Sequence, residues 1–388
     1  MRRLRLLTSA GKVETEIPYC QSMEDGTWCS PLHEAFAIAP GEVLSPELLS
    51  RLALTAAHTF SYASAAKVCA VWGSPVADDS TIHRHVQRAG DRAEQHANER
   101  ARQAPLPAVR DALTRDARTA APQRGFSLFI MMDGFMTRNR APDWGKKPAE
   151  ETALRVEWRE MKTAIVVRCH DRAETAGGRR VLVEKRIVAL EDTYEKLWPQ
   201  LYAEAAAMGL HAAREVFVVA DGGLWIWTLA GERLPAATGV LDFYHASQHL
   251  WAVAQALHGE STEEAKNFAI PLLHQLRHGG EAGVLRSLED LAALAKETMQ
   301  AGPAQETILR EQRYFETHKH HIHYKAISDR GCPVGSGAME STCAQLQGRL
   351  KRTGQFWTKP GKSKLLALIL ADHNGHWGEI TECLPIQT

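Results

Sequence analysis

The chain has 388 residues, of which 44% are hydrophobic and 24% charged, so it can form two or three packed domains and is neither disordered nor fibrous. Its 46 Lys and Arg residues balance its 46 Asp and Glu residues, which excludes a uniformly basic DNA-coating protein. Any nucleic-acid binding therefore requires segregated charge. No apolar run approaches the roughly 20 residues that span a bilayer, and the basic start lacks the apolar segment of a signal peptide. We expect a soluble, cytoplasmic protein without a membrane partner, and the seven scattered cysteines predict reduced thiols.

Residues 1–45 are expected to form a small segment, and residues 46–122 show helical periodicity. A helix is predicted to start at Asp79 or Ser80 and to end before Gly90. A helix, a glycine-containing turn and a polar basic helix follow one another as in a helix-turn-helix DNA-binding domain. The side chains expected nearest the major groove are His83, Arg84, Gln87 and Arg88.

Charge supports that interpretation without deciding it. Residues 83–124 contain nine Arg against five acids. The alternative, a solvated helix followed by a linker, explains most charge runs and stays open.

From Gly125 the composition becomes β-like, and acids recur at the ends of apolar runs. Residues 126–132 run up to Asp133, residues 216–220 up to Asp221, and residues 239–241 up to Asp242. Two further strands (157–169 and 180–190) and a helix (193–208) are predicted between the first and second of these runs. This order predicts an α/β sheet whose acids gather at one edge.

In the second half of the chain, acidic and basic residues are concentrated in different segments. Residues 246–315 are expected to be helical, and residues 260–316 hold ten acids against six bases. A helix is then predicted to begin in a Gly-rich stretch that contains Glu340. Residues 341–371 have no acid and six bases: Arg349, Lys351, Arg352, Lys359, Lys362 and Lys364.

Carboxylates at strand ends beside a core must be solvated, paired or bound to a cation. Asp133, Asp221, Asp242 and Glu340 converging without Lys or Arg would repel one another unless divalent cations hold them. Oxygen ligands favour magnesium over zinc, and such a site performs two-metal phosphoryl chemistry. Each acid taken alone could equally be an ordinary turn or cap residue.

Four blocks of sequence carry a family resemblance: Met132-Asp-Gly134, residues 219–226 (Val-Ala-Asp-Gly-Gly-Leu-Trp-Ile), residues 241–250 (Leu-Asp-Phe-Tyr-His-Ala-Ser-Gln-His-Leu) and residues 333–341 (Pro-Val-Gly-Ser-Gly-Ala-Met-Glu-Ser). In this order they resemble the blocks of bacterial insertion-sequence transposases of the ISKra and ISLre type. These are similar to the Mutator-like DDE transposases. Residues 60–83 resemble the family's N-terminal helical part and residues 349–377 its C-terminal block, so the resemblance runs from about residue 44 to residue 377.

The resemblance implies an RNase H-like catalytic core interrupted by an α-helical insertion and preceded by the helical domain. The core would occupy residues 123–255 and 331–388, the second stretch being its final helix and basic tail, and the insertion residues 256–330. The implied catalytic and metal-binding residues are Asp133, Asp221 and Glu340, with Asp242 and His245 in support.

The implied activity is DNA transposition in the bacterial cytoplasm, at the nucleoid. The enzyme would bind terminal inverted repeats and use two Mg²⁺ ions, for which Mn²⁺ can substitute, to cleave DNA and transfer the strand. Its partners would be transposon-end and target DNA, held as at least a homodimer, with the DNA backbone along the six bases of residues 341–371. Two alternatives stay open: an RNase H-like nuclease that does not join DNA, and a catalytically inactive DNA-binding regulator.

Other candidate sites are expected to be structural or peripheral. The family often has a close cysteine pair, whereas Cys20 and Cys29 have eight residues between them, so we expect no zinc site there. The histidines of residues 318–323 are expected to be basic or surface groups near DNA. Trp225, Trp227 and Trp251 are expected in the core.

Overall fold

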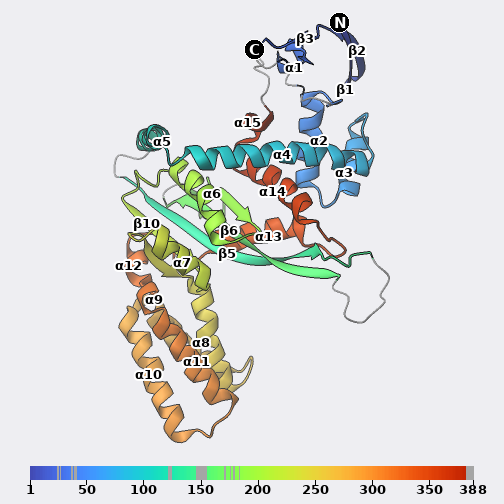
Figure 1. Cartoon of the computed structure of the whole chain (residues 1–388). Helices are drawn as coiled ribbons and strands as arrows, with labels where there is room; N and C mark the ends of the chain where they lie inside the picture. The colour runs from blue at the N-terminus through green and yellow to red at the C-terminus, as the bar shows by residue number, and fades with distance from the viewer. Residues whose placement is uncertain are drawn as a thin grey trace.

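The computed structural model describes most of the chain. The described residues are 1–23, 26, 28–35, 38, 42–120, 125–145, 155–169, 172–174, 176–177, 180–182 and 184–381. Figure 1 shows a central sheet with a layer of helices above it and a helical arm projecting below it.

The central sheet has five strands in the order β11-β10-β5-β6-β9. Their bounds are Ser127–Arg140 (β5), Val156–Arg168 (β6), Arg186–Leu190 (β9), Glu215–Ala220 (β10) and Thr238–Leu241 (β11). β5, β6 and β9 pair antiparallel, whereas β10 is parallel to both β5 and β11. The predicted α/β sheet is therefore confirmed as a mixed sheet. Residues 180–190 divide into β8 (Arg180–Leu182), which pairs with β7 (Arg172–Glu174) outside the sheet, and β9.

β5 is longer than the sequence predicts. The apolar run stops at Asp133, but pairing with β6 continues to Arg140 opposite Val156. Beyond Asp133, Phe135 and Thr137 are buried in alternation, which is the pattern of a strand with one covered face. Asp133 therefore lies within a strand, and the prediction that the strand ends there is wrong.

Both faces of the sheet are covered by helices, which explains the apolar runs. Leu128 and Ile130 of β5 pack into one core cluster, and Phe129 and Met131 into the other. On the first face lie α6 (Tyr194–Ala207) and α7 (Leu224–Arg233). The predicted helix of residues 193–208 is thus confirmed.

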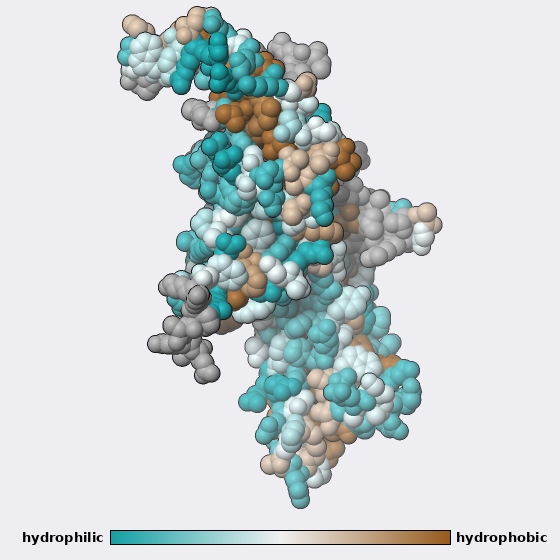
Figure 2. Space-filling model, turned by 90° about the vertical axis from the view of Figure 1, so that its right-hand side faces the viewer, coloured by the Kyte–Doolittle hydropathy of each residue, from teal (hydrophilic) through white to brown (hydrophobic). Residues whose placement is uncertain are grey.

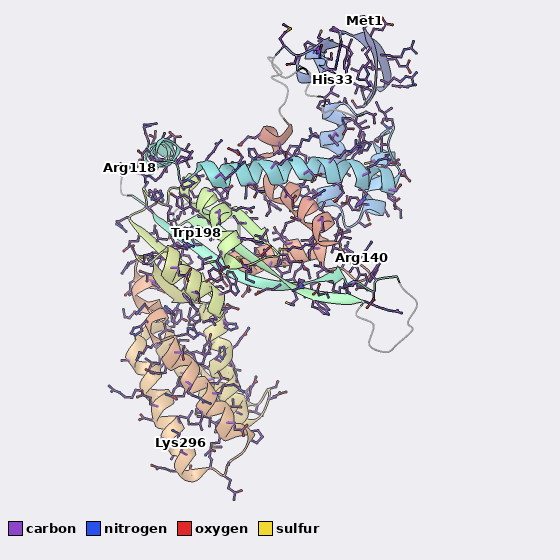
Figure 3. The ribbon with its side chains drawn as sticks, viewed as in Figure 1. Met1, His33, Arg118, Arg140, Trp198 and Lys296 are labelled. Carbon is purple, nitrogen blue, oxygen red and sulfur yellow. The ribbon has the colours of Figure 1, made fainter. Side chains whose placement is uncertain are left out.

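The helical arm consists of four long helices that follow β11 directly. They are α8 (Phe243–His258), α9 (Glu263–His278), α10 (Glu281–Thr298) and α11 (Pro303–Thr317). The predicted division at residues 255 and 256 falls inside α8, so the arm begins with α8. Lys296 lies near its far tip (Figure 3). The chain returns to the sheet through a 3-10 turn (Lys319–His321) and α12 (Tyr324–Asp329).

The helices above the sheet come from both ends of the chain. From the N-terminal part come α1 (Pro31–Ala35), α2 (Pro46–His58), α3 (Tyr62–Val71), α4 (Asp79–Gln103) and α5 (Pro107–Ala120); from the C-terminal part come α13 (Gly337–Leu350), α14 (Lys359–His373) and α15 (Trp377–Thr381). Leu52 of α2, Val86 of α4 and Leu365 of α14 belong to one core cluster. The predicted helical domain therefore shares its core with the C-terminal segment.

α4 begins at Asp79, as predicted, but it ends later than predicted. Asp78 is its N-cap and accepts a hydrogen bond from the Thr81 N–H at 2.8 Å. The helix runs through Gly90 to Gln103 instead of ending at the glycine. A Cβ atom on Gly90 would lie 2.5 Å from the Lys364 carbonyl oxygen, so this glycine permits close packing against α14 and is not a helix end.

The N-terminal segment is made of short strands. β1 (Arg2–Thr8) and β2 (Gly11–Ile17) form a hairpin, and β3 (Cys20–Gln21) pairs with β4 (Trp28–Cys29) so that Cys20 is opposite Cys29. On the face that Figure 2 shows, hydrophobic side chains gather below these strands, whereas the helical arm is mostly hydrophilic. Among the helices of the described ranges, none combines the length and apolar character needed to cross a membrane.

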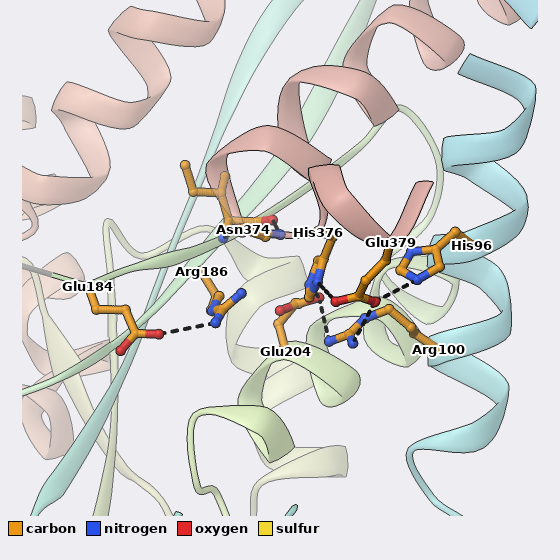
Figure 4. A network of polar contacts seen from close by, with 9 residues as sticks. His96, Arg100, Glu184, Arg186, Glu204, Asn374, His376 and Glu379 are labelled. Carbon is orange, nitrogen blue, oxygen red and sulfur yellow. Dashed lines mark hydrogen bonds and ion pairs between the residues drawn. The ribbon is translucent and has the colours of Figure 1, made fainter. Parts of the chain in front are cut away.

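A buried polar network joins α4, α6 and the C-terminal end of the chain (Figure 4). Glu204 of α6 contacts His376 Nε2 at 3.0 Å and Arg100 Nη2 of α4 at 3.4 Å. Glu379 contacts His376 Nδ1 at 3.1 Å and His96 Nε2 at 2.8 Å. Burial tends to raise the pKa of Glu204, but the His376 hydrogen bond and the Arg100 charge lower it overall.

Candidate active site

Three aspartates lie at one level of the sheet because of strand register. Ala220 of β10 pairs with Met132 of β5 on one side and with Leu241 of β11 on the other. The next residue of each strand is an aspartate, at positions 133, 221 and 242. The predicted gathering of these acids at one edge is therefore met, although β5 itself continues past it.

Glu340, from α13, lies within electrostatic range of Asp133. It lies in the first turn of that helix, where the backbone N–H groups favour negative charge, and its side chain is exposed. The pKa of Asp133 is raised chiefly by burial, and the charges of Asp221 and Glu340 raise it further, against a hydrogen bond from the Gly134 N–H. The charges of Asp221 and Glu340 thus both act on Asp133.

Cys343 holds the Asp133 carboxylate. Its thiol donates to Asp133 Oδ2 at a donor-to-acceptor distance of 3.6 Å. Burial and the Asp133 charge raise the pKa of Cys343 to about 12, so this sulfur stays protonated and donates. The sequence contained the signal for this contact, since Cys343 lies three residues after Glu340 and therefore on the same helix face.

Asp221 is fixed by its own turn and by the helical arm. The Gly223 N–H donates to Asp221 Oδ1 at 3.0 Å, and the Tyr314 hydroxyl of α11 donates to the Asp221 carbonyl oxygen at 3.1 Å. Between them Gly222 has φ 102°, and a Cβ atom there would approach the Tyr314 hydroxyl to 3.0 Å. Burial and the Asp221 charge raise the pKa of Tyr314, so its hydroxyl remains a donor.

Tyr314 belongs to a stacked group that sequence reasoning missed. Its ring stacks on His249 of α8 at 3.7 Å between centroids, and His249 Nδ1 contacts Glu311 Oε2 at 2.5 Å. His245 lies edge-on to His249 at 5.1 Å. These contacts join helices that are about 60 residues apart in sequence, a spacing that no local pattern reveals.

The Asp242 carboxylate holds backbone groups in place and does not have the exposed geometry of a metal ligand. It is 2% exposed and caps α8 by accepting from the His245 N–H at 2.7 Å. Its second oxygen accepts from the Ser336 N–H, and the Phe243 N–H donates to the Val334 carbonyl at 3.1 Å. Asp242 therefore connects the sheet edge to the loop that leads into the helix of Glu340.

The histidines of residues 318–323 do not form a basic surface. His318 is buried, and His321 stacks on Trp227 at 4.0 Å. Burial and the neighbouring histidines lower the pKa of His321 to about 4, so it is neutral at pH 7. His320 is exposed. The prediction of surface groups is thus wrong for His318 and His321, whereas Trp227 packs against the core as expected.

The donor set suits a hard divalent cation in its chemistry. In the described part of the chain, no Lys or Arg forms an ion pair with Asp133, Asp221 or Glu340, so no basic side chain there neutralises these carboxylates. As the side chains lie, however, no three His, Cys, Asp or Glu groups among the described residues are close enough together to hold a metal ion.

The predicted major-groove residues of α4 have different surroundings. His83 and Arg84 are exposed. Gln87 donates to the Gly361 carbonyl at 3.2 Å, and Arg88 lies 3.6 Å from Glu42. The Gln87 amide is therefore engaged between α4 and α14, which contradicts its prediction as a base-reading residue.

The bases of residues 341–371 are also not alike. Lys362 is 1% exposed and contacts Thr137, Asn139 and Glu191, so the prediction that it holds DNA is wrong. Arg349 is buried and does not lie on the open surface, although it lines a cavity.

The remaining bases of this segment are nearer the surface. Lys359 pairs with Asp192 at 3.3 Å and Lys364 with Asp91 at 2.8 Å. Lys351 lies near the Trp158 ring, and Arg352 lies 3.9 Å from the centroid of the Phe60 ring.

Comparison with known protein families identifies a matching family. The pattern of UPF0236, described as an uncharacterised protein family, matches residues 149–382, which is more than half of the chain. The match covers Asp221, Asp242 and Glu340, and begins after Asp133. No curated protein matches the chain. The chain therefore belongs to the uncharacterised protein family UPF0236.

Proposed function

We propose that the protein is a DNA transposase of an insertion sequence, which cleaves DNA at the ends of the element and joins the freed strand to target DNA. One observation carries this proposal. Strand register brings Asp133 and Asp221 to the same edge, and the charge of Glu340 acts on Asp133, with no basic partner for any of the three among the described residues.

The order of elements supports an RNase H-like core for this reaction. Three consecutive strands pair antiparallel, and two strands that each follow a helix then add in parallel on the other side of the first strand. The helical arm enters after β11 and leaves before α13, as an insertion between the second aspartate and the glutamate would. The resemblance to the insertion-sequence transposases rests on the same residues.

Asp133, Asp221 and Glu340 would hold divalent cations, for which Mg²⁺ is the expected metal. Bound there, the ions would supply activation of a water or 3′ hydroxyl and neutralisation of the leaving oxygen. The protein's own groups do the positioning. Cys343 fixes one oxygen of Asp133, while Tyr314 and Gly223 fix the backbone and carboxylate of Asp221. Asp242 holds the loop before Glu340.

DNA would run across the helical layer near these acids. Arg84, Lys351 and Arg352 are the candidate phosphate contacts whose side chains are at least partly exposed. Phe60 and Trp158, beside Arg352 and Lys351, are exposed aromatic rings of the kind that stack on unpaired bases.

The test is cleavage of DNA that carries the sequences flanking the gene. In Mg²⁺, the wild-type chain should cut at the element ends, and Asp133→Ala, Asp221→Ala and Glu340→Ala should each lower the cleavage rate by roughly a thousandfold. End binding by gel shift should persist in all three variants, because these acids do not supply the positive surface. Cleavage that survives any one of the substitutions would remove that residue from the proposed triad.

A pre-cut end distinguishes the two enzyme alternatives. A transposase joins a DNA end with a free 3′ hydroxyl to a target plasmid, whereas a nuclease only hydrolyses DNA. Asp242→Asn serves as the comparison, since it changes a positioning residue and should reduce the rate less than loss of a triad acid. Hydrolysis without joining by the wild-type chain would replace the proposed function with that of a nuclease.

A further inference from the structure

A cavity of about 310 Å³ lies where four distant parts of the chain meet. Its walls come from the start of α3, from α4, from the end of β5 and from residues 349–361. Arg140, Arg349 and His83 line it, and none of its lining residues is an acid. In a chain with equal numbers of acids and bases, a cavity of this composition is selective for anions.

The Arg349 guanidinium is the strongest feature of this cavity. Arg349 is 6% exposed, and its Nε donates to the Ala56 carbonyl at 3.2 Å. Its Nη1 and Nη2 atoms are buried without a hydrogen-bond partner in the part of the chain that the structure describes. The rings of Tyr62 and Trp357 lie 5.5 and 5.4 Å from its central carbon, and aromatic faces attract a cation but do not accept its in-plane N–H bonds.

Buried N–H groups of a charged side chain that lack a hydrogen-bond acceptor destabilise the folded protein. Leaving a buried polar group unpaired usually costs more than its hydrogen bond contributes, and more still for a charged group. Native proteins therefore supply an acceptor, which is a protein group, a water or a bound ion. The cavity is much larger than the about 10–15 Å³ of probe volume that one water needs.

Two further groups make the cavity suitable for an anion. Arg140 is an exposed residue at the end of β5 (Figure 3), held by a hydrogen bond from its Nε to the Phe356 carbonyl at 3.2 Å. His83 packs edge-on against Tyr62 at 4.8 Å between ring centroids. Desolvation of its ring lowers the pKa of His83, although the residue is exposed as a whole, and the Arg140 charge lowers it further. At pH 7 His83 is therefore a neutral hydrogen-bonding group of the cavity.

The N-terminus of α14 also faces this region. Thr358 caps the helix by accepting from the Gly361 N–H at 3.2 Å, and both residues line the cavity. Helix N-termini attract phosphate through their N–H groups and their dipole. A side chain at position 361 would collide with Thr358 Oγ1, at 2.8 Å from the added Cβ, so glycine keeps this end of the helix narrow.

We propose that this cavity binds one phosphate group, as a phosphodiester of the DNA strand that the protein processes. The Arg349 guanidinium would donate its free N–H groups to the phosphate oxygens, and Arg140 would pair with the phosphate from the rim. The choice of DNA as the source of the phosphate rests on the proposed function, whereas the phosphate specificity rests on the cavity alone.

The first experiment measures DNA affinity by fluorescence anisotropy with a labelled 20-base-pair duplex at several salt concentrations. Arg140→Gln should weaken binding by roughly tenfold and reduce the slope of log affinity against log salt by about 1. Arg349→Lys keeps the charge but removes the planar fork, and should weaken binding similarly. Arg286→Gln, an exposed arginine of α10 outside the cavity, is the matched control and should change neither quantity.

A second arm uses pyrophosphate and distinguishes free phosphate from DNA. In thermal unfolding of the full chain, pyrophosphate should raise the melting temperature of the wild type and of Arg286→Gln but not of Arg140→Gln. If DNA affinity is unchanged in both cavity variants while pyrophosphate still discriminates them, the cavity serves a free phosphate compound and its assignment to DNA is overturned. If neither ligand discriminates the variants, the phosphate site itself is overturned. A wild-type chain that binds pyrophosphate but never cleaves DNA would overturn the proposed function and leave the site standing.

Discussion

At the scale of single residues, Asp133 is held where its own charge is unfavourable. Burial and two neighbouring acids raise its pKa, so the folded protein binds a proton at this carboxyl more readily than the unfolded chain does. The contribution of Asp133 to stability is therefore complete below pH 3.8, its ordinary value, and is lost as the pH rises through the folded-state pKa. At neutral pH the ionised Asp133 therefore lowers the free energy of unfolding relative to a neutral side chain at this position, a cost that functional sites often carry.

Asp133→Asn should accordingly raise the melting temperature at pH 7, and the difference from wild type should vanish below about pH 4. Scanning calorimetry at pH 7 and pH 3.5 measures both. Asp290→Asn, an exposed acid of α10, should leave the melting temperature within a degree or two. Adding Mg²⁺ at about 100 times its dissociation constant should stabilise the wild type by roughly 2.7 kcal/mol and the Asp133 variant by much less. A lower melting temperature for Asp133→Asn at pH 7 would contradict the charge argument.

Sequence patterns located these acids but not their partners. Asp221 and Asp242 follow short apolar runs, so their shared level is readable from the chain. Tyr314 lies 93 residues from Asp221 and has no motif, so its hydrogen bond depends on how the arm folds back. Charge counting failed for Lys362, because a lysine beside distant acceptors such as Glu191 looks the same in sequence as one in solvent.

At the scale of elements, Gly90 decides how closely α4 and α14 pack. An alanine normally stabilises a helix interior by about 1 kcal/mol relative to glycine. At position 90 the added Cβ would lie 2.5 and 2.8 Å from backbone atoms of Lys364, which cannot move away as a flexible side chain could. Overpacking of this kind typically costs about 1–3 kcal/mol.

Gly90→Ala should therefore destabilise the protein by about 1–3 kcal/mol in urea unfolding. Gly231→Ala in α7 is the matched control: nothing lies within 4 Å of its added Cβ, so it should stabilise by up to about 1 kcal/mol. If both substitutions change the free energy of unfolding in the same direction, α4 and α14 can move apart more easily than the backbone distances imply.

Elements with a clear period were predictable, and their ends were not. β10, β11 and α6 lie within a residue or two of their predicted bounds, because apolar runs and Gly209 delimit them. α4 was predicted too short, since a glycine that permits helix packing is locally indistinguishable from one that ends a helix.

At the scale of the whole molecule, the Glu204 network fastens the C-terminal end of the chain to α4 and to the sheet. Burial opposes the charge of Glu204, but His376, Arg100 and Arg186 lower its pKa below its ordinary value of 4.5. Its contribution to stability is therefore complete above pH 4.5 and is lost as the pH falls through the lower, folded-state pKa.

Glu204→Gln should cost about 2 kcal/mol at pH 7, because a buried charged hydrogen bond is lost, and the cost should shrink as the pH falls below 4.5. Equilibrium unfolding at pH 7 and pH 4 tests this. Glu184→Gln breaks a partly exposed pair with Arg186 at 3.1 Å, seen at the edge of Figure 4, and should cost less than 1 kcal/mol. If the two variants lose the same free energy of unfolding, the buried network does not stabilise the protein more than an exposed ion pair does.

The arrangement of the large parts was the least predictable from sequence. Residues 46–122 were expected to form a helical domain of their own, and residues 331–388 to complete the RNase H-like core, whereas α2, α4 and α14 share one core cluster. Both segments are amphipathic, and an apolar face does not reveal whether it meets a sheet, a neighbouring helix or a helix 270 residues away.

The helical arm is attached to the acids at both of its ends. α8 starts at Asp242, whose carboxylate also holds the loop before Glu340, and α11 returns to Asp221 through Tyr314. A tilt of the arm that preserves both sets of hydrogen bonds would therefore be transmitted to the Asp221 backbone and to the loop before Glu340.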